Sequence, residues 1–307
     1  MRAFVTGGSG FVGSNVVKVF TERHGVDVVA PSHAAVDLTD RARVHESVAE
    51  ARPDAIVHSA ILNDLGRLYS DRRAAWDAYV SATRNLVDAA NAVRAKLVLV
   101  STDWVYDGTQ SAADERTPPN PINLYGVLKL ASELVVAERA RDGAVARISG
   151  VNGVHWARPT GPRTQDAGFG YFVASMVEAL SAGRPFSVWV SEDINMIATP
   201  SLASTSADLM WRIIDRDRRG IFHCCGGEPI GRWRLAEQAA DAFGLDRSLL
   251  REGRPDPVAR LAPVPYDTSI AATATAAALD AALPSVREQL VELRHEVETG
   301  SLAAAAA

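Results

Sequence analysis

The sequence predicts an α/β protein built on a doubly wound parallel sheet, with a smaller and discontinuous C-terminal part. Short β-branched runs alternate with longer helical stretches through the first half of the chain, which is typical of βαβ units. A glycine-rich turn follows the first predicted strand. The 307 residues are 47% hydrophobic, so the chain is long enough and apolar enough to bury one large core or two small ones.

The first half of the chain alternates regularly between two kinds of element. Short runs rich in β-branched residues predict strands at residues 3–5, 26–30, 55–58, 97–101 and 145–148. Longer stretches between them predict helices at residues 11–24, 42–51, 73–93 and 124–141. Because a helix separates each pair of consecutive strands, we expect the strands to lie parallel in one sheet.

The rhythm changes after about residue 150, where a Gly- and Pro-rich stretch covers residues 158–162. The elements expected further on are a helix at 172–181, a strand at 186–190, a helix at 235–243 and extended or looped chain at 254–265. The low-complexity end, 303–307, is expected to be frayed. Residues 1–150 therefore form one predicted domain, rejoined by a segment near 186–215, and residues 151–185 and 216–307 form the other.

Charge and cysteine content exclude several classes of protein. A net charge of -5 gives no electrostatic reason to expect nucleic acid or an anionic membrane as a partner. Apolar runs stay well short of the roughly 18 to 20 residues that span a bilayer. The chain opens directly on a predicted strand, without a basic and then apolar leader, and its two cysteines, Cys224 and Cys225, are adjacent. We expect a cytoplasmic protein with two buried thiols and no bound metal.

The turn after the first strand has the spacing of a dinucleotide-binding fingerprint. Gly7 and Gly10 would allow a tight turn and a close approach of the backbone to a pyrophosphate, and Gly13 would let the helix pack closely on the strand. The phosphates would then meet free N–H groups near Phe11 and Val12 at the helix N-terminus. The larger domain is therefore predicted to be Rossmann-type and to bind a dinucleotide, with the smaller part binding substrate.

The end of the second strand bears on the choice of cofactor. A carboxylate there would bind the adenosine ribose diol and repel a 2′-phosphate, yet the strand ends in Pro31, Ser32 and His33. We therefore expect NADP(H) over NAD(H), with Ser32 and His33 as polar contacts. Asp37 either contacts the adenine or has a plain loop role, and Asp40 is placed to cap the next helix.

Tyr125 and Lys129 are four residues apart on a predicted helix, so they share one face. A nearby ammonium would lower the pKa of a tyrosine, which is a poor acid at neutral pH. Thr102 ends a predicted strand 23 residues before Tyr125 and could hydrogen-bond a substrate carbonyl. The three side chains therefore form a candidate catalytic set.

These motifs resemble the extended short-chain dehydrogenase/reductases. The resemblance is carried by the glycine turn, by Ser-Thr-Asp-Trp-Val-Tyr-Asp-Gly at 101–108 and by Tyr-Gly-Val-Leu-Lys at 125–129. The form of the second motif is close to the dTDP-4-dehydrorhamnose reductase branch. Segments 37–40, 53–58 and 265–270 also look like that branch. The resemblance thus covers most of the chain.

The resemblance implies a reductase in which a nicotinamide delivers hydride to a ketone, most simply a nucleotide-linked 4-keto sugar. Tyr125 would protonate the ketone oxygen, Lys129 would hold Tyr125 and the ribose, and Thr102 would orient the carbonyl. The remaining candidates for cofactor contact are Leu38, Ser59 and Ala60. The candidates for substrate contact are Asn63, Trp104, His155 and Trp156.

The chain departs from the family pattern at several positions. Tyr79 stands where many extended members have an asparagine, and the fifth strand continues from Arg147 without the tryptophan of the rhamnose branch. Trp104 replaces the glutamate that accompanies an acid in sugar-nucleotide dehydratases, so Asp103 is predicted to have a structural role. His58 is expected to be packed rather than catalytic.

Two other functions stay open from the sequence. One is a sugar-nucleotide epimerase that retains its NAD. The other is a non-catalytic, NADP-binding regulatory subunit like that of methionine adenosyltransferase, which also resembles the rhamnose branch. The apolar faces at 76–93 and 124–136 would either form the interface of a homodimer or be buried within one subunit.

Overall fold

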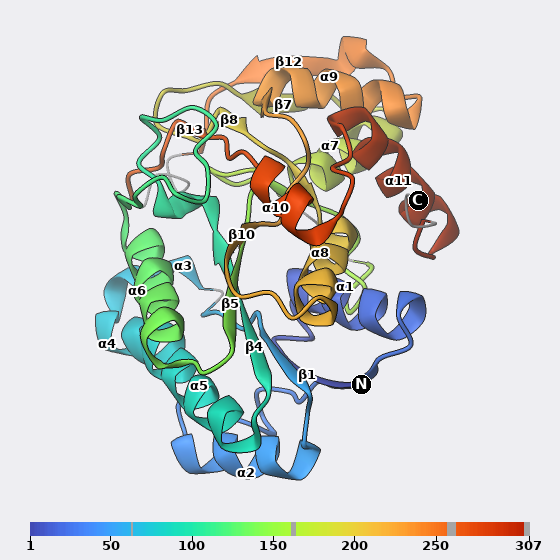
Figure 1. Ribbon diagram of the computed structural model, residues 1–307. Coiled ribbons are helices and arrows are strands. Elements are labelled where there is room, and N and C mark those ends of the chain that lie inside the picture. The colour runs from blue at the N-terminus through green and yellow to red at the C-terminus, as the bar shows by residue number, and fades with distance from the viewer. Residues whose placement is uncertain (63, 161–163, 257–261, 304–307) are drawn as a thin grey trace.

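The computed structural model describes residues 1–62, 64–160, 164–256 and 262–303 (Figure 1). Its centre is a six-stranded parallel sheet in the order β10, β5, β4, β3, β1, β2. The strands are β1 (Arg2–Thr6), β2 (Asp27–Val29), β3 (Ala55–His58), β4 (Lys96–Thr102), β5 (Gly143–Ile148) and β10 (Gly220–His223). The predicted doubly wound parallel sheet is confirmed.

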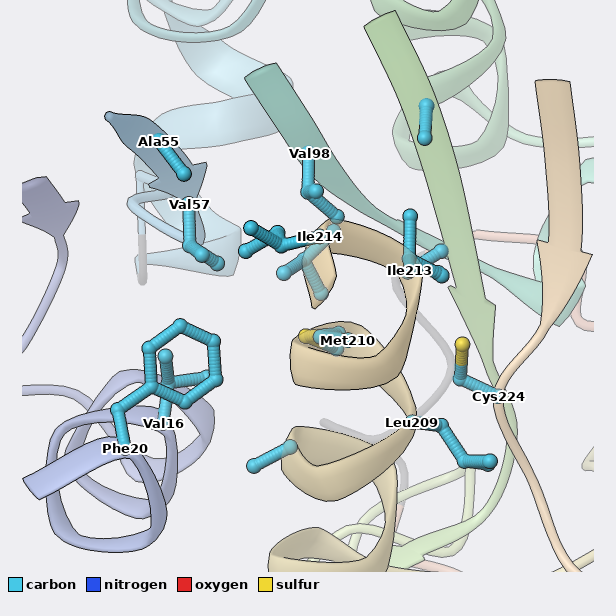
Figure 2. Packing of buried hydrophobic residues seen from close by; sticks show 14 of the residues in the cluster. Val16, Phe20, Ala55, Val57, Val98, Leu209, Met210, Ile213, Ile214 and Cys224 are labelled. Carbon is cyan, nitrogen blue, oxygen red and sulfur yellow. The ribbon is translucent and has the colours of Figure 1, made fainter. Parts of the chain in front are cut away.

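Helices cover both faces of this sheet, and its central strands β3 and β4 are accordingly buried along their whole length. One face packs on α1 (Phe11–Lys18), the π-helical turn η1 (Val19–Arg23) and α8 (Ala203–Asp215). Figure 2 shows side chains of α8, among them Met210 and Ile214, close to Val57 and Val98 of the sheet. The other face packs on α2 (Arg41–Ala51), α5 (Ala82–Val93) and α6 (Leu124–Arg139).

Two predicted helices are built from more than one helical segment. The predicted helix at 73–93 consists of α4 (Arg72–Trp76), a π-helical turn η2 (Asp77–Ser81) and α5. The predicted helix at 11–24 likewise continues from α1 into η1. Periodicity in a sequence does not separate an α-helical turn from a π-helical one, so the prediction located these helices without their changes of pitch.

The second half of the chain builds a smaller layer of helices and short strands. Its apolar cluster is formed largely by α7 (Phe172–Ser181), α9 (Arg232–Phe243) and α11 (Val286–Thr299). The short strands are β6 (Val151–Asn152), β7 (Phe186–Trp189), β8 (Ile197–Ala198), β9 (Ser201–Leu202), β11 (Ile230–Gly231), β12 (Leu250–Gly253) and β13 (Asp267–Thr268). The remaining helices are α3 (Leu65–Ser70), η3 (Asp103–Val105), η4 (Arg247–Leu249) and α10 (Thr273–Leu279).

Two elements of the second half, α8 and β10, belong to the central sheet layer. In the predicted return segment, 186–215, β7 pairs with β12 of the smaller layer, whereas α8 packs under the central sheet. The sixth strand, β10, follows this segment and pairs with β5 at the edge of the central sheet. The sequence pattern did not indicate this position. The domain boundaries themselves stay a prediction.

The two cysteines follow directly after β10. Both are buried free thiols, as the sequence predicted, and burial raises the pKa of each. Across the described ranges, the His, Cys, Asp and Glu side chains form no cluster of three or more that could hold a metal ion. Helices long and apolar enough to cross a bilayer are likewise missing from the described part of the chain.

A buried ion pair joins the fifth strand to the helix that covers it. Arg147 of β5 donates from Nη2 to Oε2 of Glu133 on α6 at 2.6 Å and from Nε to Oε1 at 3.0 Å. Both side chains are at least 96% shielded from solvent. Arg147 also donates to the Tyr106 hydroxyl at 2.7 Å, and the Ser101 hydroxyl at the end of β4 donates to Glu133. The pair therefore fixes three segments relative to one another.

We predict that Arg147→Met lowers the free energy of unfolding by about 3–5 kcal/mol, because it leaves the Glu133 carboxylate buried without its partner. Urea denaturation of the variant and the parent chain measures the difference. Arg73→Met is the matched control: it removes an exposed arginine paired with Asp77, and its denaturation midpoint should stay close to that of the parent. Similar midpoints for the two variants would contradict the structural role of the buried pair.

Candidate active site

The glycine turn lies at the carboxyl end of β1, against the end of β3. Gly7 has a φ of +72°, and a Cβ there would lie 2.7 Å from the backbone nitrogen of Ala60. A Cβ on Gly13 would overlap the carbonyl oxygen of Gly7. The Ser59 hydroxyl donates to the carbonyl oxygen of Thr6 at 2.7 Å. The predicted neighbours Ser59 and Ala60 therefore form one wall of the turn.

The start of α1 leaves its N–H groups available for an anion. The helix begins at Phe11, and its N-cap residue, Gly10, makes no side-chain capping bond. The first amides of a helix have no partner within the helix and carry the positive end of its dipole. Together with a glycine cradle that a Cβ would fill, this end of α1 fits the pyrophosphate of a dinucleotide.

The end of β2 presents a mostly polar and exposed surface. Ser32 and His33 are exposed. Asp37 accepts hydrogen bonds from the backbone N–H and the hydroxyl of Thr39, at 2.9 and 2.8 Å, and these bonds lower the pKa of its carboxyl. Leu38 accepts at its carbonyl from Asn85 at 2.9 Å. Asp37 thus stays ionised at the edge of this surface.

The Asp40 side chain accepts from the Arg43 amide at the start of α2, at 3.1 Å. The predicted helix cap is confirmed.

The helix α6 carries Tyr125 and Lys129 in its first two turns. Asn123 caps it by accepting from the amide of Gly126 at 2.9 Å. A Cβ on Gly126 would overlap the carbonyl oxygen of Trp104, so glycine is required for the helix to approach η3 this closely. This glycine, whose role the sequence analysis did not identify, places Tyr125 beside the end of β4.

Tyr125 lies close to Thr102 and Trp104, in a partly enclosed position. Burial raises the pKa of its phenol well above the ordinary range, and a hydrogen bond with the Thr102 side chain opposes that rise. The Trp104 ring meets the Tyr125 ring edge to face, with centroids 5.9 Å apart. The structure therefore brings Thr102, Trp104 and Tyr125 together, as the sequence analysis expected.

Lys129 is bonded to the end of β4. Its ammonium donates to the carbonyl oxygen of Val100 at 2.8 Å, and burial lowers its pKa to about 8, although Glu133 opposes that shift. Burial raises the pKa of Tyr125 and Lys129 is not among the groups that shift it here, so the predicted roles of Lys129 toward Tyr125 and the ribose stay predictions. Tyr79, which stands where many extended members have an asparagine, is buried beside both residues: its ring centroid lies 5.6 Å from Lys129 Nζ and 6.1 Å from the Tyr125 ring centroid.

Asp103 has the structural role that the sequence predicted. Its carboxyl oxygens accept from the Thr102 hydroxyl at 3.0 Å and the Ser149 hydroxyl at 2.7 Å, and burial raises its pKa to about 6. His58 is likewise packed as predicted. Its Nδ1 lies 2.8 Å from the Thr6 hydroxyl oxygen, and burial lowers its pKa to about 3.

The remaining predicted substrate residues lie elsewhere. The His155 ring packs 6.0 Å from that of Phe11, and the Trp156 indole donates to Asn15 of α1 at 3.0 Å. Both thus lie beside the start of α1 rather than beside Tyr125, and their substrate role stays a prediction. Asn63 lies outside the described residues.

One acidic residue near Tyr125 was not found from the sequence. Asp166 acts on the pKa of Tyr125 through its charge, and its own pKa rises to about 6 because the surrounding protein encloses it. The residue is nevertheless exposed to solvent and is not part of the core. It lies in an irregular segment without a motif, which left no signal in the sequence.

A groove lies away from the candidate catalytic side chains. This groove of about 290 Å³ runs between α6, β5 and the edge strand β10, and the buried pair of Arg147 and Glu133 contributes to its lining. Its lining includes none of Thr102, Tyr125 and Lys129. The chemistry is therefore placed by the side chains at the ends of β1 and β4, and not by this groove.

Comparisons with known proteins agree with this geometry. The chain matches the family described as RmlD substrate binding domain over residues 1–299. It is 30% identical over 264 residues to methionine adenosyltransferase 2 subunit beta of Rattus norvegicus, covering 84% of this chain and 76% of that protein. It is 29% identical over 261 residues to the probable low-salt glycan biosynthesis reductase Agl14 of Haloferax volcanii, covering 81% and 83%.

The fold is shared with solved structures of the same group. The dTDP-4-dehydrorhamnose reductase of Bacillus anthracis, in complex with NADP, superposes with a TM-score of 0.81 at 22% identity, covering 96% of this chain and 99% of that one. A hypothetical dTDP-4-dehydrorhamnose reductase from Sulfolobus tokodaii gives 0.76 at 26% identity, covering 93% and 97%. The chain therefore belongs to the RmlD substrate binding domain family, within the extended short-chain dehydrogenase/reductases.

Proposed function

We propose that this protein is an NAD(P)-dependent oxidoreductase that reduces a ketone, namely a nucleotide-linked 4-keto sugar. The observation that carries the proposal is the placement of Thr102 and Tyr125 together at the carboxyl edge of the sheet, the edge at which β1 delivers the glycine turn. Ligands of open α/β sheets bind at this edge. The family match and the reductases of the same fold support this assignment.

The side chains have distinct roles in the proposed reaction. A bound nicotinamide would supply the hydride. Tyr125 donates the phenolic proton to the ketone oxygen, and the Thr102 hydroxyl orients the carbonyl. The Tyr125 phenol carries the proton that reduction requires, but burial raises its pKa and so weakens it as an acid; a bound cofactor would have to supply the charge that stabilises the phenolate. Lys129 would hold the cofactor ribose, and it supports the end of β4 through its bond to Val100.

We further propose that NADP(H) is the preferred cofactor. The surface after β2 offers Ser32 and His33 and no acid directly at the strand end. A 2′-phosphate could be accepted there, with the ionised Asp37 turned toward Thr39. We place the reaction in the cytoplasm, because the two cysteines remain free thiols.

One observation favours a second function. Vertebrate proteins named methionine adenosyltransferase 2 subunit beta match this chain as well as any reductase reported above. A regulatory subunit on this fold would bind a dinucleotide without turning over a sugar. Tight NADPH binding without oxidation by a broad panel of 4-keto sugar nucleotides would favour this second function over the first.

We predict that Tyr125→Phe lowers kcat for reduction of a 4-keto sugar nucleotide by about 10²- to 10⁴-fold, since the general acid is lost. Cofactor affinity should be retained because only the phenol oxygen is removed. Steady-state kinetics and NADPH titration measure the two effects. Tyr266→Phe, which removes an exposed phenol elsewhere, is the control and should leave kcat unchanged. A Tyr125→Phe variant as fast as the parent in single-turnover reduction would exclude the proposed acid.

We predict that NADPH binds at least as tightly as NADH, and that Ser32→Asp weakens NADPH more than NADH. The introduced carboxylate would repel a 2′-phosphate, whereas Ser32→Asn, of the same shape, would not. Fluorescence titration of each variant with both cofactors gives the ratio of affinities. A parent protein that binds NADH tenfold more tightly, about 1.4 kcal/mol, would overturn the preference.

We predict a homodimer formed through the outer faces of α4 and α6. The apolar side of α5 is buried within the subunit, but Trp76, Val127 and Leu134 remain exposed, the last at 56%. Val127 and Leu134 are seven residues apart and so share one face of α6, and apolar residues gathered on one exposed face are typical of interaction surfaces. Light scattering at micromolar concentration should give twice the chain mass, and Leu134→Glu should lower it. A monomer mass for the parent protein would reject the dimer.

A further inference from the structure

We propose that Asp166 is a specificity-determining residue whose carboxylate accepts hydrogen bonds from hydroxyl groups of the sugar ring beside Tyr125. The inference rests on the proposed function and extends it to the part of the substrate that is recognised. A neutral, hydroxylated sugar would be favoured, and a uronic acid, whose carboxylate would meet Asp166, would be disfavoured.

Hydrogen bonds from Arg232 hold the segment that carries Asp166. Arg232, at the start of α9, is fully buried and donates through Nη2 to the carbonyl oxygens of Asp166, Ala167 and Gly168. Its guanidinium also lies 4.8 Å from the ring centroid of Phe169. The arginine therefore binds the backbone of this segment, and its charge also favours the ionised form of the Asp166 carboxyl.

The Asp166 carboxylate lies close to the Trp104 ring. A Cβ on Gly168 would be 3.4 Å from Oδ1 of Asp166 and 3.1 Å from Cζ2 of Trp104, so the carboxylate and the indole flank the same point. Trp104 in turn meets Tyr125 edge to face. The charge of Asp166 also reaches the phenol of Tyr125. Asp166 thus lies next to the group that would protonate the ketone.

The chemistry of Asp166 and Trp104 fits a sugar ring. The amide of Gly170 donates to Oδ1 of Asp166 at 3.2 Å, and the backbone of Gly168 also bonds this carboxyl. These bonds orient the carboxylate, and with about four acceptor positions it can still accept from a ligand. An ionised carboxylate is an acceptor only and forms strong bonds with hydroxyl donors. Trp104 offers a flat apolar surface beside it. A ring with hydroxyl groups at its edge and C–H groups on its face satisfies both.

The test uses Asp166→Asn in the full-length chain, assayed with NADPH and a 4-keto sugar nucleotide that the parent protein reduces. We expect KM to rise at least tenfold, kcat to change less than threefold, and the Kd for NADPH to stay unchanged, because the amide no longer accepts at both oxygens. Asp166→Ala serves as a second variant and should behave alike. Glu178→Gln, which removes an exposed carboxylate from α7, is the control and should leave every constant unchanged.

A substrate analogue makes the test specific. The analogue that lacks the contacted hydroxyl should lose affinity for the parent protein and not for Asp166→Asn, since a site built to bond a hydroxyl discriminates against its removal. An unchanged KM in the variant, with the parent active, would overturn the proposal and leave the reductase function standing. A fall in kcat at constant KM would also overturn it, because Asp166 would then act in the chemistry. If the parent binds NADPH but neither binds nor reduces any sugar nucleotide, both proposals fail.

Discussion

The buried pair of Arg147 and Glu133 is the interaction on which the arrangement of this site depends. It ties the fifth strand to α6, the helix that bears Tyr125 and Lys129. Through the Ser101 hydroxyl it also reaches the residue before Thr102 at the end of β4. Two charges this far from water are tolerated because each is paired and hydrogen-bonded, and removal of either would leave an uncompensated charge. The position of Tyr125 relative to the end of β4 therefore depends on an interaction in the core.

Close approaches of backbone to backbone provide the second constraint. Gly7 lies against Ala60 at one side of the site, and Gly126 lies against Trp104 at the other. A side chain at either position would push a helix away from the sheet, and the N-terminus of α1 or the ring of Tyr125 would move with it. The spacing between the dinucleotide cradle and the candidate acid is therefore set by two residues that contribute no functional group.

Burial, more than charge pairing, sets the protonation states in this region. It raises the pKa of Tyr125 and lowers that of Lys129 to about 8, so each group is shifted toward its neutral form. Asp103, with a pKa near 6, follows the same rule, and its bonds from Thr102 and Ser149 limit the shift. A protonated phenol suits a step in which an oxygen receives a proton. The same burial disfavours the phenolate that this transfer leaves on Tyr125, so the step depends on charge that a bound cofactor would supply.

The sequence by itself determined the βαβ order, the position of the glycine turn and the candidates Thr102, Tyr125 and Lys129, because each depends on local spacing along the chain. It also indicated the structural role of Asp103. The tertiary structure alone decided the rest. The sixth strand, the bond from Lys129 to Val100 and the place of Asp166 beside Tyr125 each join segments from 29 to more than 40 residues apart. Such contacts follow from how the layers pack, and a one-dimensional pattern carries no record of the distances between them.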